Sequence, residues 1–194
     1  MKYDFIEIGT SDFETLIEDN SGKIGLTIEP LLFYLDNLPE RPTVIKVNCA
    51  ITDYDGEIKI YYINPEDIRN YNLPNWLKGC NSVNEPHPSA MVELVNRGLE
   101  HLMQYQNCEC LSWETLINRY NVESVDFLKV DTEGHDCVII NSILDTNKIL
   151  PKKIHFEANI LTELNIIDNT LKRLTGLGYN VIMKTEHEII VEKK

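Results

Sequence analysis

Basic residues are scarce in this 194-residue sequence. Lysine and arginine number 18 against 31 aspartates and glutamates, which gives a formal net charge of −13 at pH 7. Proteins that bind nucleic acid need clustered cations to contact phosphates, so this balance argues against a nucleic-acid partner. The negative charge favours solubility and suits a cationic ligand.

Long apolar runs are also missing. No stretch approaches the roughly 20 apolar residues of a membrane-spanning helix, so no membrane partner is expected. Met1-Lys2-Tyr3-Asp4 leads directly into a predicted strand, which argues against a signal peptide. The five cysteines are irregularly spaced, and Cys108-Glu109-Cys110 has no second ligand pair. Reduced thiols and a cytoplasmic location are therefore expected.

Several catalytic signatures are absent. The sequence has neither Gly-x-Ser-x-Gly nor Gly-x-x-x-x-Gly-Lys, which argues against serine hydrolases and kinases. A short-chain dehydrogenase would need the full Gly-x-Gly-x-x-Gly fingerprint and a Tyr-x-x-x-Lys pair, and neither is present. A nicotinamide-dependent oxidoreductase is therefore the least favoured alternative, although fold alone does not exclude it.

The most informative stretch is Val125–Asp136. Its first half, Val125–Val130, is apolar apart from Asp126 and Lys129 and predicts a buried strand, and apolar residues recur at helical spacing after the turn. In an open parallel sheet, the turn after a strand lies where ligands bind, so Asp131, Glu133 and His135 are candidate catalytic residues. The alternative is that they only cap the helix and interact with its dipole.

Two strand–turn–helix units are predicted near the N-terminus. The strand Asp4–Ile8 runs into a glycine turn, where Ser11 and Glu14 form a capping-box pattern that predicts a helix to about Asp19. A second strand, Lys23–Ile28, ends at Glu29-Pro30, and a helix to Leu38 should follow. The spacing favours a role for Glu29 in accepting hydrogen bonds from a ribose diol. The alternative is that its charge only interacts with the N-terminus of the following helix.

The rest of the chain predicts a mostly parallel α/β doubly wound sheet in one domain, residues 1–194, with a C-terminal antiparallel hairpin. Residues 64–110 are proline-rich and irregular, which favours a substrate-facing lid with one short helix over a surface excursion. The further predicted elements are the strand Thr43–Ala50, the ribbon strand Ile58–Ile63 added to the same sheet, the helix from Ser112 to about Tyr120, the strand Lys153–Phe156, a helix capped by Asp168, and the hairpin Tyr179–Met183 with Ile189–Glu192.

Right-handed crossovers would bring the turns after these strands to one edge of the sheet. That edge would carry an acidic, hydrogen-bonding set of residues without a lysine that could cradle phosphate. Its members are Gly9, Asp12, Glu29, Asp131, Glu133, His135, Glu157 and Asn159.

At these positions the sequence resembles the FkbM-type methyltransferases. Phe127–Asp136 is similar to the signature of that family, and Glu7–Asp12, Ile28–Pro30, Ala50–Gly56 and Leu177–Tyr179 resemble other segments in the same order. The resemblance covers nearly the whole chain. It implies a class I Rossmann-like fold that uses S-adenosylmethionine, commonly for O-methylation. The chain departs from the family pattern at Ser11, where a second glycine is frequent.

The resemblance also implies where the cofactor would bind. Glu29 would hold the ribose, the turn from Gly9 to Asp12 would lie beneath the methionine part, and Asp131 would sit near the amino group or the reacting methyl. Asn48, Ala50 and Ile51 would lie near the adenine. The full expected cofactor-binding set is Glu7, Gly9, Thr10, Ser11, Asp12, Glu29, Asn48, Ala50, Ile51 and Asp131.

A hydroxyl acceptor on a small molecule or glycan would also need a base. His135, Glu133 or His87 could serve, and His135 is slightly preferred because an unperturbed imidazole titrates closest to neutral pH. Asn81, Ser82, His87, Glu157 and Asn159 are the expected substrate-binding residues. No metal is expected, although Asp131, Glu157 and Asn159 form a less favoured Mg²⁺ set. A non-catalytic binding module of the same fold is the main alternative function.

Overall fold

The structure is a computed structural model that describes residues 1–11, 13, 15–18 and 22–193. Within these residues the larger sheet has seven strands. They are β1 (Lys2–Ile8), β2 (Gly25–Ile28), β3 (Val44–Val47), β8 (Ser124–Val130), β9 (Lys153–Glu157), β10 (Tyr179–Lys184) and β11 (Glu188–Lys193).

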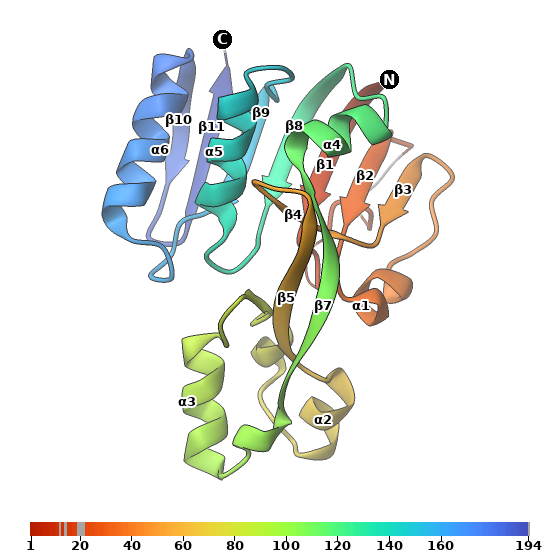
Figure 1. The fold of residues 1–194 in the computed structure, drawn as a ribbon, viewed down its shortest axis with the longest axis vertical. Helices are drawn as coiled ribbons and strands as arrows, with labels where there is room; N and C mark the ends of the chain where they lie inside the picture. The colour runs from red at the N-terminus through yellow and green to blue at the C-terminus, as the bar shows by residue number, and fades with distance from the viewer. Residues whose placement is uncertain (12, 14, 19–21, 194) are drawn as a thin grey trace.

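The spatial order of this sheet is β10-β11-β9-β8-β1-β2-β3 (Figure 1). Strands β1, β2, β3, β8 and β9 are parallel, and β11 is antiparallel to both β9 and β10. The predicted α/β sheet with a C-terminal hairpin is therefore confirmed. Because β1 pairs with β2 on one side and with β8 on the other, the winding direction reverses at β1. The carboxyl edge at such a reversal is the usual ligand-binding crevice.

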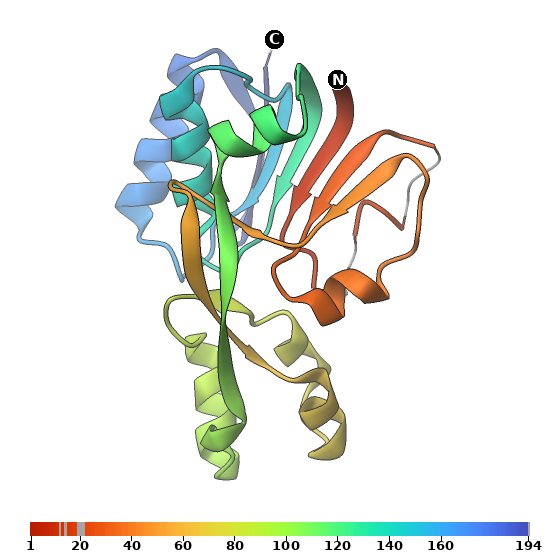
Figure 2. The same ribbon diagram turned by 45° about the vertical axis from the view of Figure 1, so that its right-hand side comes forward.

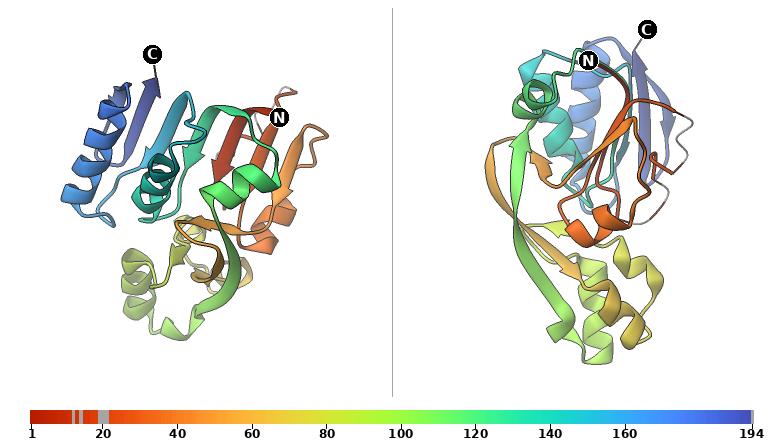
Figure 3. Two further views of the ribbon diagram at one scale, coloured as in Figure 1. Left: turned by 45° about the horizontal axis from the view of Figure 1, so that its top comes forward. Right: turned by 90° about the vertical axis from the view of Figure 1, so that its right-hand side faces the viewer.

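Three helices cover one face of the sheet: α4 (Trp113–Arg119), α5 (Asp136–Thr146) and α6 (Leu164–Gly176) (Figure 3). Their apolar sides enclose the main core, which includes the fully buried Trp113 and Ile143. The predicted cap of α4 is confirmed, because the Ser112 hydroxyl accepts from the Thr115 backbone N–H at 3.2 Å. The predicted cap at Asp168 is wrong, since α6 begins one turn earlier, at Leu164.

The helix predicted after Ser11 does not form within the described residues. Residues 16–18 form a turn, while Asp12 and Glu14 lie outside the described residues. The Leu16 N–H donates to the Glu7 carboxylate at 2.9 and 3.0 Å instead of to a backbone carbonyl. Side-chain acceptors of this kind compete with helical hydrogen bonds. Ile17 is nevertheless fully buried, and it packs with Leu35 of the short helix α1 (Leu32–Asn37).

The predicted ribbon does not join the main sheet. Ile58–Ile63 belongs to a second sheet of β4 (Ala50–Thr52), β5 (Gly56–Ile63), β6 (Ser82–Val83) and β7 (Met103–Ser112). Within the described residues its order is β4-β7-β5-β6. The third strand of the main sheet consequently ends at Val47 instead of Ala50. The long β5–β7 pair forms an arm that extends beyond the carboxyl edge of the main sheet (Figures 1 and 2).

The segment between β5 and β7, residues 64–102, is called the insertion below. It holds more helix than predicted: α2 (Pro65–Asn70), η1 (Asn75–Lys78), α3 (Pro88–Arg97) and η2 (Glu100–Leu102). With the end of β5 it buries an apolar cluster of its own, which includes Ile68, Leu77 and Leu94. The longest helix described in the chain, α6, has 13 residues, and no described helix meets the length and hydropathy that a membrane span requires.

The turns after β1 and β8 approach each other so closely that only glycine fits at position 9. Gly9 has φ +78°, and a Cβ atom there would lie 1.9 Å from the Asp131 carbonyl oxygen. The Gly9 N–H also donates to the Ile28 carbonyl at 3.0 Å. A side chain would therefore force apart the turns that border the carboxyl edge.

We expect Gly9→Ala to lower the free energy of unfolding by about 2–4 kcal/mol, because it adds a backbone clash to an unfavourable φ. Gly178→Ala is the matched control: Gly178 also has a positive φ, +90°, but nothing lies within 4 Å of its added Cβ. Urea unfolding should give a loss near 1 kcal/mol for the control. Equal losses in the two variants would contradict the importance of the close approach.

Candidate functional site

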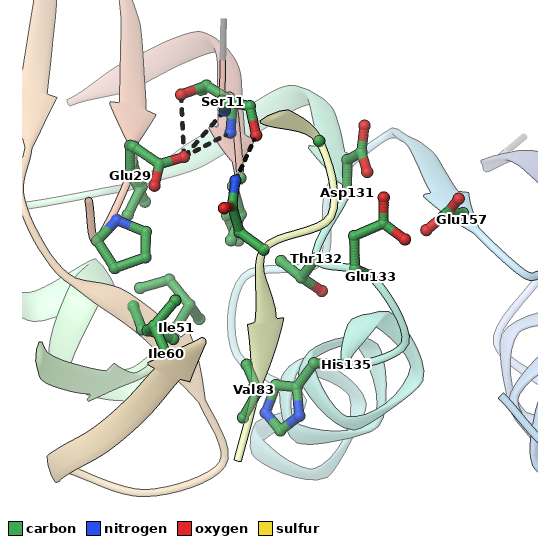
Figure 4. A pocket seen from close by; sticks show the side chains of 18 of the residues that line it. Ser11, Glu29, Ile51, Ile60, Val83, Asp131, Thr132, Glu133, His135 and Glu157 are labelled. Carbon is green, nitrogen blue, oxygen red and sulfur yellow. Dashed lines mark hydrogen bonds between the residues drawn. The ribbon is translucent and has the colours of Figure 1, made fainter. Parts of the chain in front are cut away.

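A cavity of about 220 Å³ opens at the carboxyl edge of the main sheet (Figure 4). Its walls come from the turns after β1, β2 and β8, from β4 and β5, and from residues 79–83 of the insertion. Seven of the predicted cofactor residues line it. They are Gly9, Thr10, Ser11, Glu29, Ala50, Ile51 and Asp131.

Three members of the predicted cofactor set are not among the lining residues. Asp12 lies outside the described residues. Asn48 is exposed, and its amide donates to the Glu29 and Pro30 carbonyls at 3.0 and 2.9 Å, so it supports the backbone after β2. Glu7 is buried, and its carboxylate pairs with Lys129 at 3.2 Å. Burial raises the pKa of Glu7 to about 7, and Lys129 acts against this increase.

Glu29 ties the first two turns of the sheet together. Its Oε2 accepts from the Thr10 N–H at 3.0 Å, the Thr10 hydroxyl at 3.2 Å and the Ser11 N–H at 3.0 Å. Its Oε1 accepts from the Leu31 N–H at 2.9 Å. Burial raises the pKa of Glu29, while these donors favour its charged form. A carboxylate offers about four lone-pair sites, so a ribose diol would have to displace at least one of these donors.

Ser11, where the family pattern has glycine, adopts φ +43°. Glycine adopts this left-handed conformation without strain, whereas serine does so less readily. The Ser11 hydroxyl accepts from the Asn81 amide at 3.0 Å, which links the turn to the insertion. Asn81, predicted to bind substrate, thus lines the cavity and holds one of its walls.

Asp136 holds the turn that follows β8, a role the sequence did not reveal beyond its place at the start of a helix. It is fully buried, and its Oδ2 accepts from the Thr132 N–H and hydroxyl at 3.2 and 2.8 Å. Its Oδ1 accepts from the Glu157 N–H at 3.0 Å. Burial raises the pKa of Asp136 to about 7 despite these donors. The turn carrying Asp131 and Glu133 is thereby fixed against the end of β9.

Three carboxylates gather above β8 and β9. Oxygens of Asp131, Glu133 and Glu157 lie within 4.8 Å of one another. Burial, and then the charges of Glu133, Asp131 and Asp136, raise the pKa of Glu157 to about 8, and its buried Oε2 has no hydrogen-bond partner. Oxygens at this spacing are ligands of the kind that Mg²⁺ prefers. Asn159 of the predicted metal and substrate sets lies beside this cluster, where a hydrogen bond from its side chain acts to lower the pKa of Glu157, and its Oδ1 accepts from the Leu161 N–H at 2.8 Å.

A second cavity, of about 190 Å³, adjoins the first. The predicted substrate residues Ser82 and His87 line it, and it shares Val83, Glu133 and His135 with the first cavity. Two of the three predicted catalytic residues therefore stand at the border between the cavities. The third, Asp131, lines the first cavity but not the second.

His135 lies beside the second sheet at this border. Its Nε2 is 2.8 Å from the Thr52 hydroxyl, which in turn donates to Asp53 at 3.1 Å. Burial lowers the pKa of His135, and the nearby Asp53 acts in the opposite direction. Because the Thr52 hydroxyl uses its proton in the hydrogen bond to Asp53, its oxygen can only accept from His135. The Nε2 of a neutral His135 therefore carries the proton, and its Nδ1 is the acceptor.

A family model described as the methyltransferase FkbM domain matches residues 6–181. Because this match spans most of the chain, the protein belongs to the FkbM methyltransferase domain family. The resemblance found in the sequence is thus confirmed. No curated protein sequence matches the chain.

A solved structure shares the fold. The crystal structure of methyltransferase FkbM from Methylobacillus flagellatus KT aligns with a TM-score of 0.53 at 13% sequence identity. The alignment covers 98% of this chain and 43% of that one, so the chain spans less than half the length of the similar protein. At this identity the likeness supports the common fold and not a common substrate.

The raised pKa of Glu157 predicts how stability depends on pH. Glu157 binds its proton more tightly in the folded than in the unfolded protein, so stability should fall as pH rises from about 4.5 to about 8. Glu157→Gln removes this contribution. Urea unfolding should therefore show that the free energy of unfolding falls less between pH 5 and pH 8.5 in the variant than in the wild type. The difference should be on the order of 1–3 kcal/mol after solvent screening.

Glu192→Gln is the control for this measurement, because Glu192 is an exposed glutamate of β11. It should lose as much stability between the two pH values as the wild type. Glu7 and Asp136, whose pKa values are raised to about 7, keep some pH dependence in every variant. Indistinguishable curves for wild type and Glu157→Gln would contradict the assigned burial of the Glu157 carboxyl.

Proposed function

We propose that the protein is an S-adenosylmethionine-dependent methyltransferase that methylates a hydroxyl group of a small molecule or glycan. One observation carries the proposal: residues from the turns after β1, β2 and β8 converge on a single cavity in a chain of the FkbM family. S-adenosylmethionine would supply an electrophilic methyl group on a sulfonium ion.

The lining of the first cavity suits such a ligand. Ala50, Ile51 and Ile60 offer an apolar surface for the adenine, and Glu29 stands at the end of β2, where nucleotide folds contact ribose. Gly9 lets the turn after β8 approach the turn after β1, so that Asp131 lines the same cavity. Asp131 and Glu133 contribute negative charge in a partly buried site, where attraction to a sulfonium cation exceeds that in bulk water.

The second cavity is the proposed acceptor site. An acceptor there would reach the first cavity across the border formed by Glu133 and His135. Methyl transfer requires the acceptor oxygen in line with the methyl carbon at near-attack distance. As the C–O bond forms and the C–S bond breaks, the electron pair goes to sulfur and the hydroxyl proton goes to a base. We assign Glu133 as that base, because it adjoins both cavities and two other carboxylates.

Glu29→Gln should weaken binding of S-adenosylhomocysteine at least tenfold, because the variant loses a charged acceptor at the ribose position. Isothermal titration calorimetry measures this, with thermal melting by circular dichroism to check the fold. Glu7→Gln is the matched comparison: Glu7 is equally buried at the end of the neighbouring strand but does not line the cavity. The proposal fails if neither variant differs from wild type, or if only Glu7→Gln weakens binding.

Glu133→Gln should lower the rate of methyl transfer by a factor of about 100 or more, because the amide cannot take the acceptor proton. Transfer of label from tritiated S-adenosylmethionine to a panel of sugars, glycans and small-molecule alcohols measures this. S-adenosylhomocysteine affinity should change little. A larger loss in His135→Gln would assign the base to His135, and tight cofactor binding without any transfer by wild type would favour a non-catalytic module.

A further inference from the structure

His87 of the insertion is held at both of its ring nitrogens. Its Nδ1 accepts from the Ser89 backbone N–H at 3.2 Å, which makes His87 the N-cap of α3. Its Nε2 lies 3.3 Å from Glu133 Oε2, and the side chain is only 8% exposed. Pro88 follows directly, and a residue before proline is confined to extended backbone, here φ −58° and ψ 123°.

These contacts determine where the imidazole proton resides. A backbone N–H can only donate, so the His87 Nδ1 that accepts from Ser89 carries no proton. The Nε2 must then carry the proton, and this N–H donates a hydrogen bond to the Glu133 carboxylate. His87 therefore has no free basic nitrogen, which removes it from the predicted candidates for the base.

Glu133 needs such a donor. It adopts φ +50°, a left-handed conformation that is strained for a non-glycine residue, next to Gly134 at φ +97°. Its carboxylate oxygen also lies within 4.8 Å of oxygens of Asp131 and Glu157, and the charge of Asp131 repels that of Glu133. Without a hydrogen bond from the opposite side, this repulsion would favour side-chain rotamers that turn away from the cavity border.

We propose that His87 is a positioning residue for Glu133: its Nε2–H holds the carboxylate at the border between the two cavities. This inference rests on the proposed function, because it concerns the base of the same reaction. It also gives the insertion a defined part in catalysis. The helix α3 delivers, through its N-cap, the donor that aligns a carboxylate of the main sheet edge.

Two substitutions separate the two ends of the imidazole. In His87→Asn, the side-chain oxygen can still accept from Ser89 N–H, since asparagine is a good N-cap, but nothing reaches Glu133. In His87→Gln, the amide nitrogen can reach the position of Nε2 and donate to Glu133, but the cap is lost. His101→Asn, an exposed histidine of η2, is the matched control.

The positioning role predicts that activity depends on the hydrogen bond to Glu133, whereas stability depends on the helix cap that accepts from Ser89 N–H. We expect His87→Asn to lower kcat about tenfold or more with the KM for S-adenosylmethionine within about twofold, and His87→Gln to retain at least about a third of kcat. His87→Gln should be the less stable of the two in urea. Full kcat in His87→Asn, or the larger kcat loss in His87→Gln, would overturn the proposal.

Nitrogen-15 NMR of the histidine side chains tests the pair without an acceptor. The neutral tautomer protonated at Nε2 is expected for His87, and Glu133→Ala should shift its imidazole signals. A His87 protonated at Nδ1, or signals unchanged in Glu133→Ala, would overturn the proposal. If wild type transfers no methyl group, the proposed function fails, while these signals still decide whether His87 holds Glu133.

Discussion

The contact between the turns after β1 and β8 is the constraint on which the site depends. Gly9 lies against the Asp131 carbonyl, and Asp131 N–H donates to the Ile8 carbonyl at 2.9 Å. Gly9 N–H donates in turn to the carbonyl of Ile28. Backbone hydrogen bonds therefore continue past the ends of β1, β2 and β8, at the point where the winding direction reverses. These backbone hydrogen bonds hold the main chain around the cavity without a contribution from side chains.

The carboxylates around this edge fall into two groups: Glu29 and Asp136 are buried, whereas Asp131, Glu133 and Glu157 are partly or fully exposed. Glu29 and Asp136 each accept several hydrogen bonds from neighbouring turns, so their negative charge stabilises the loops that carry the site. Asp131, Glu133 and Glu157 instead lie together at one side of the cavity, with oxygens within 4.8 Å of one another (Figure 4). A carboxylate that is saturated by donors has little capacity left for a ligand. We therefore assign the proposed methyl transfer to the second group, which the first group keeps in place. A ribose would bind Glu29 only by replacing one of the donors from the turns.

Local patterns in the sequence predicted the elements that local interactions determine. The strand, turn and helix at 125–146 and the C-terminal hairpin follow from apolar periodicity and turn residues, and the structure has them. The second sheet was missed because β5 pairs along its length with β7, which is distant in sequence. The helix after Ser11 was predicted from its cap, but the acceptor that displaced it, Glu7, belongs to the preceding strand.

The part of the candidate site that lies in the turns after parallel strands was also predictable from the sequence. Residues in turns after parallel strands were expected at one edge, and Gly9, Glu29, Asp131, Glu133, His135 and Glu157 do line one cavity. Glu7 was included because it adjoins the turn, but its carboxylate pairs with Lys129 and does not line the cavity. The pairing of His87 with Glu133 joins residues of the insertion and the main sheet, and no spacing rule relates them.

The division between sheet and insertion has a consequence for specificity. Residues that surround the proposed cofactor come mainly from the main sheet edge, whereas Ser82, Pro86 and His87 of the insertion line the second cavity and not the first. The insertion has its own apolar cluster and stands on the long β5–β7 arm, so its surface residues can vary without disturbing the main core. If the second cavity binds the acceptor, as we propose, substitutions of these insertion residues would change which acceptor fits. The contact of His87 with Glu133 is the one that such changes would have to preserve.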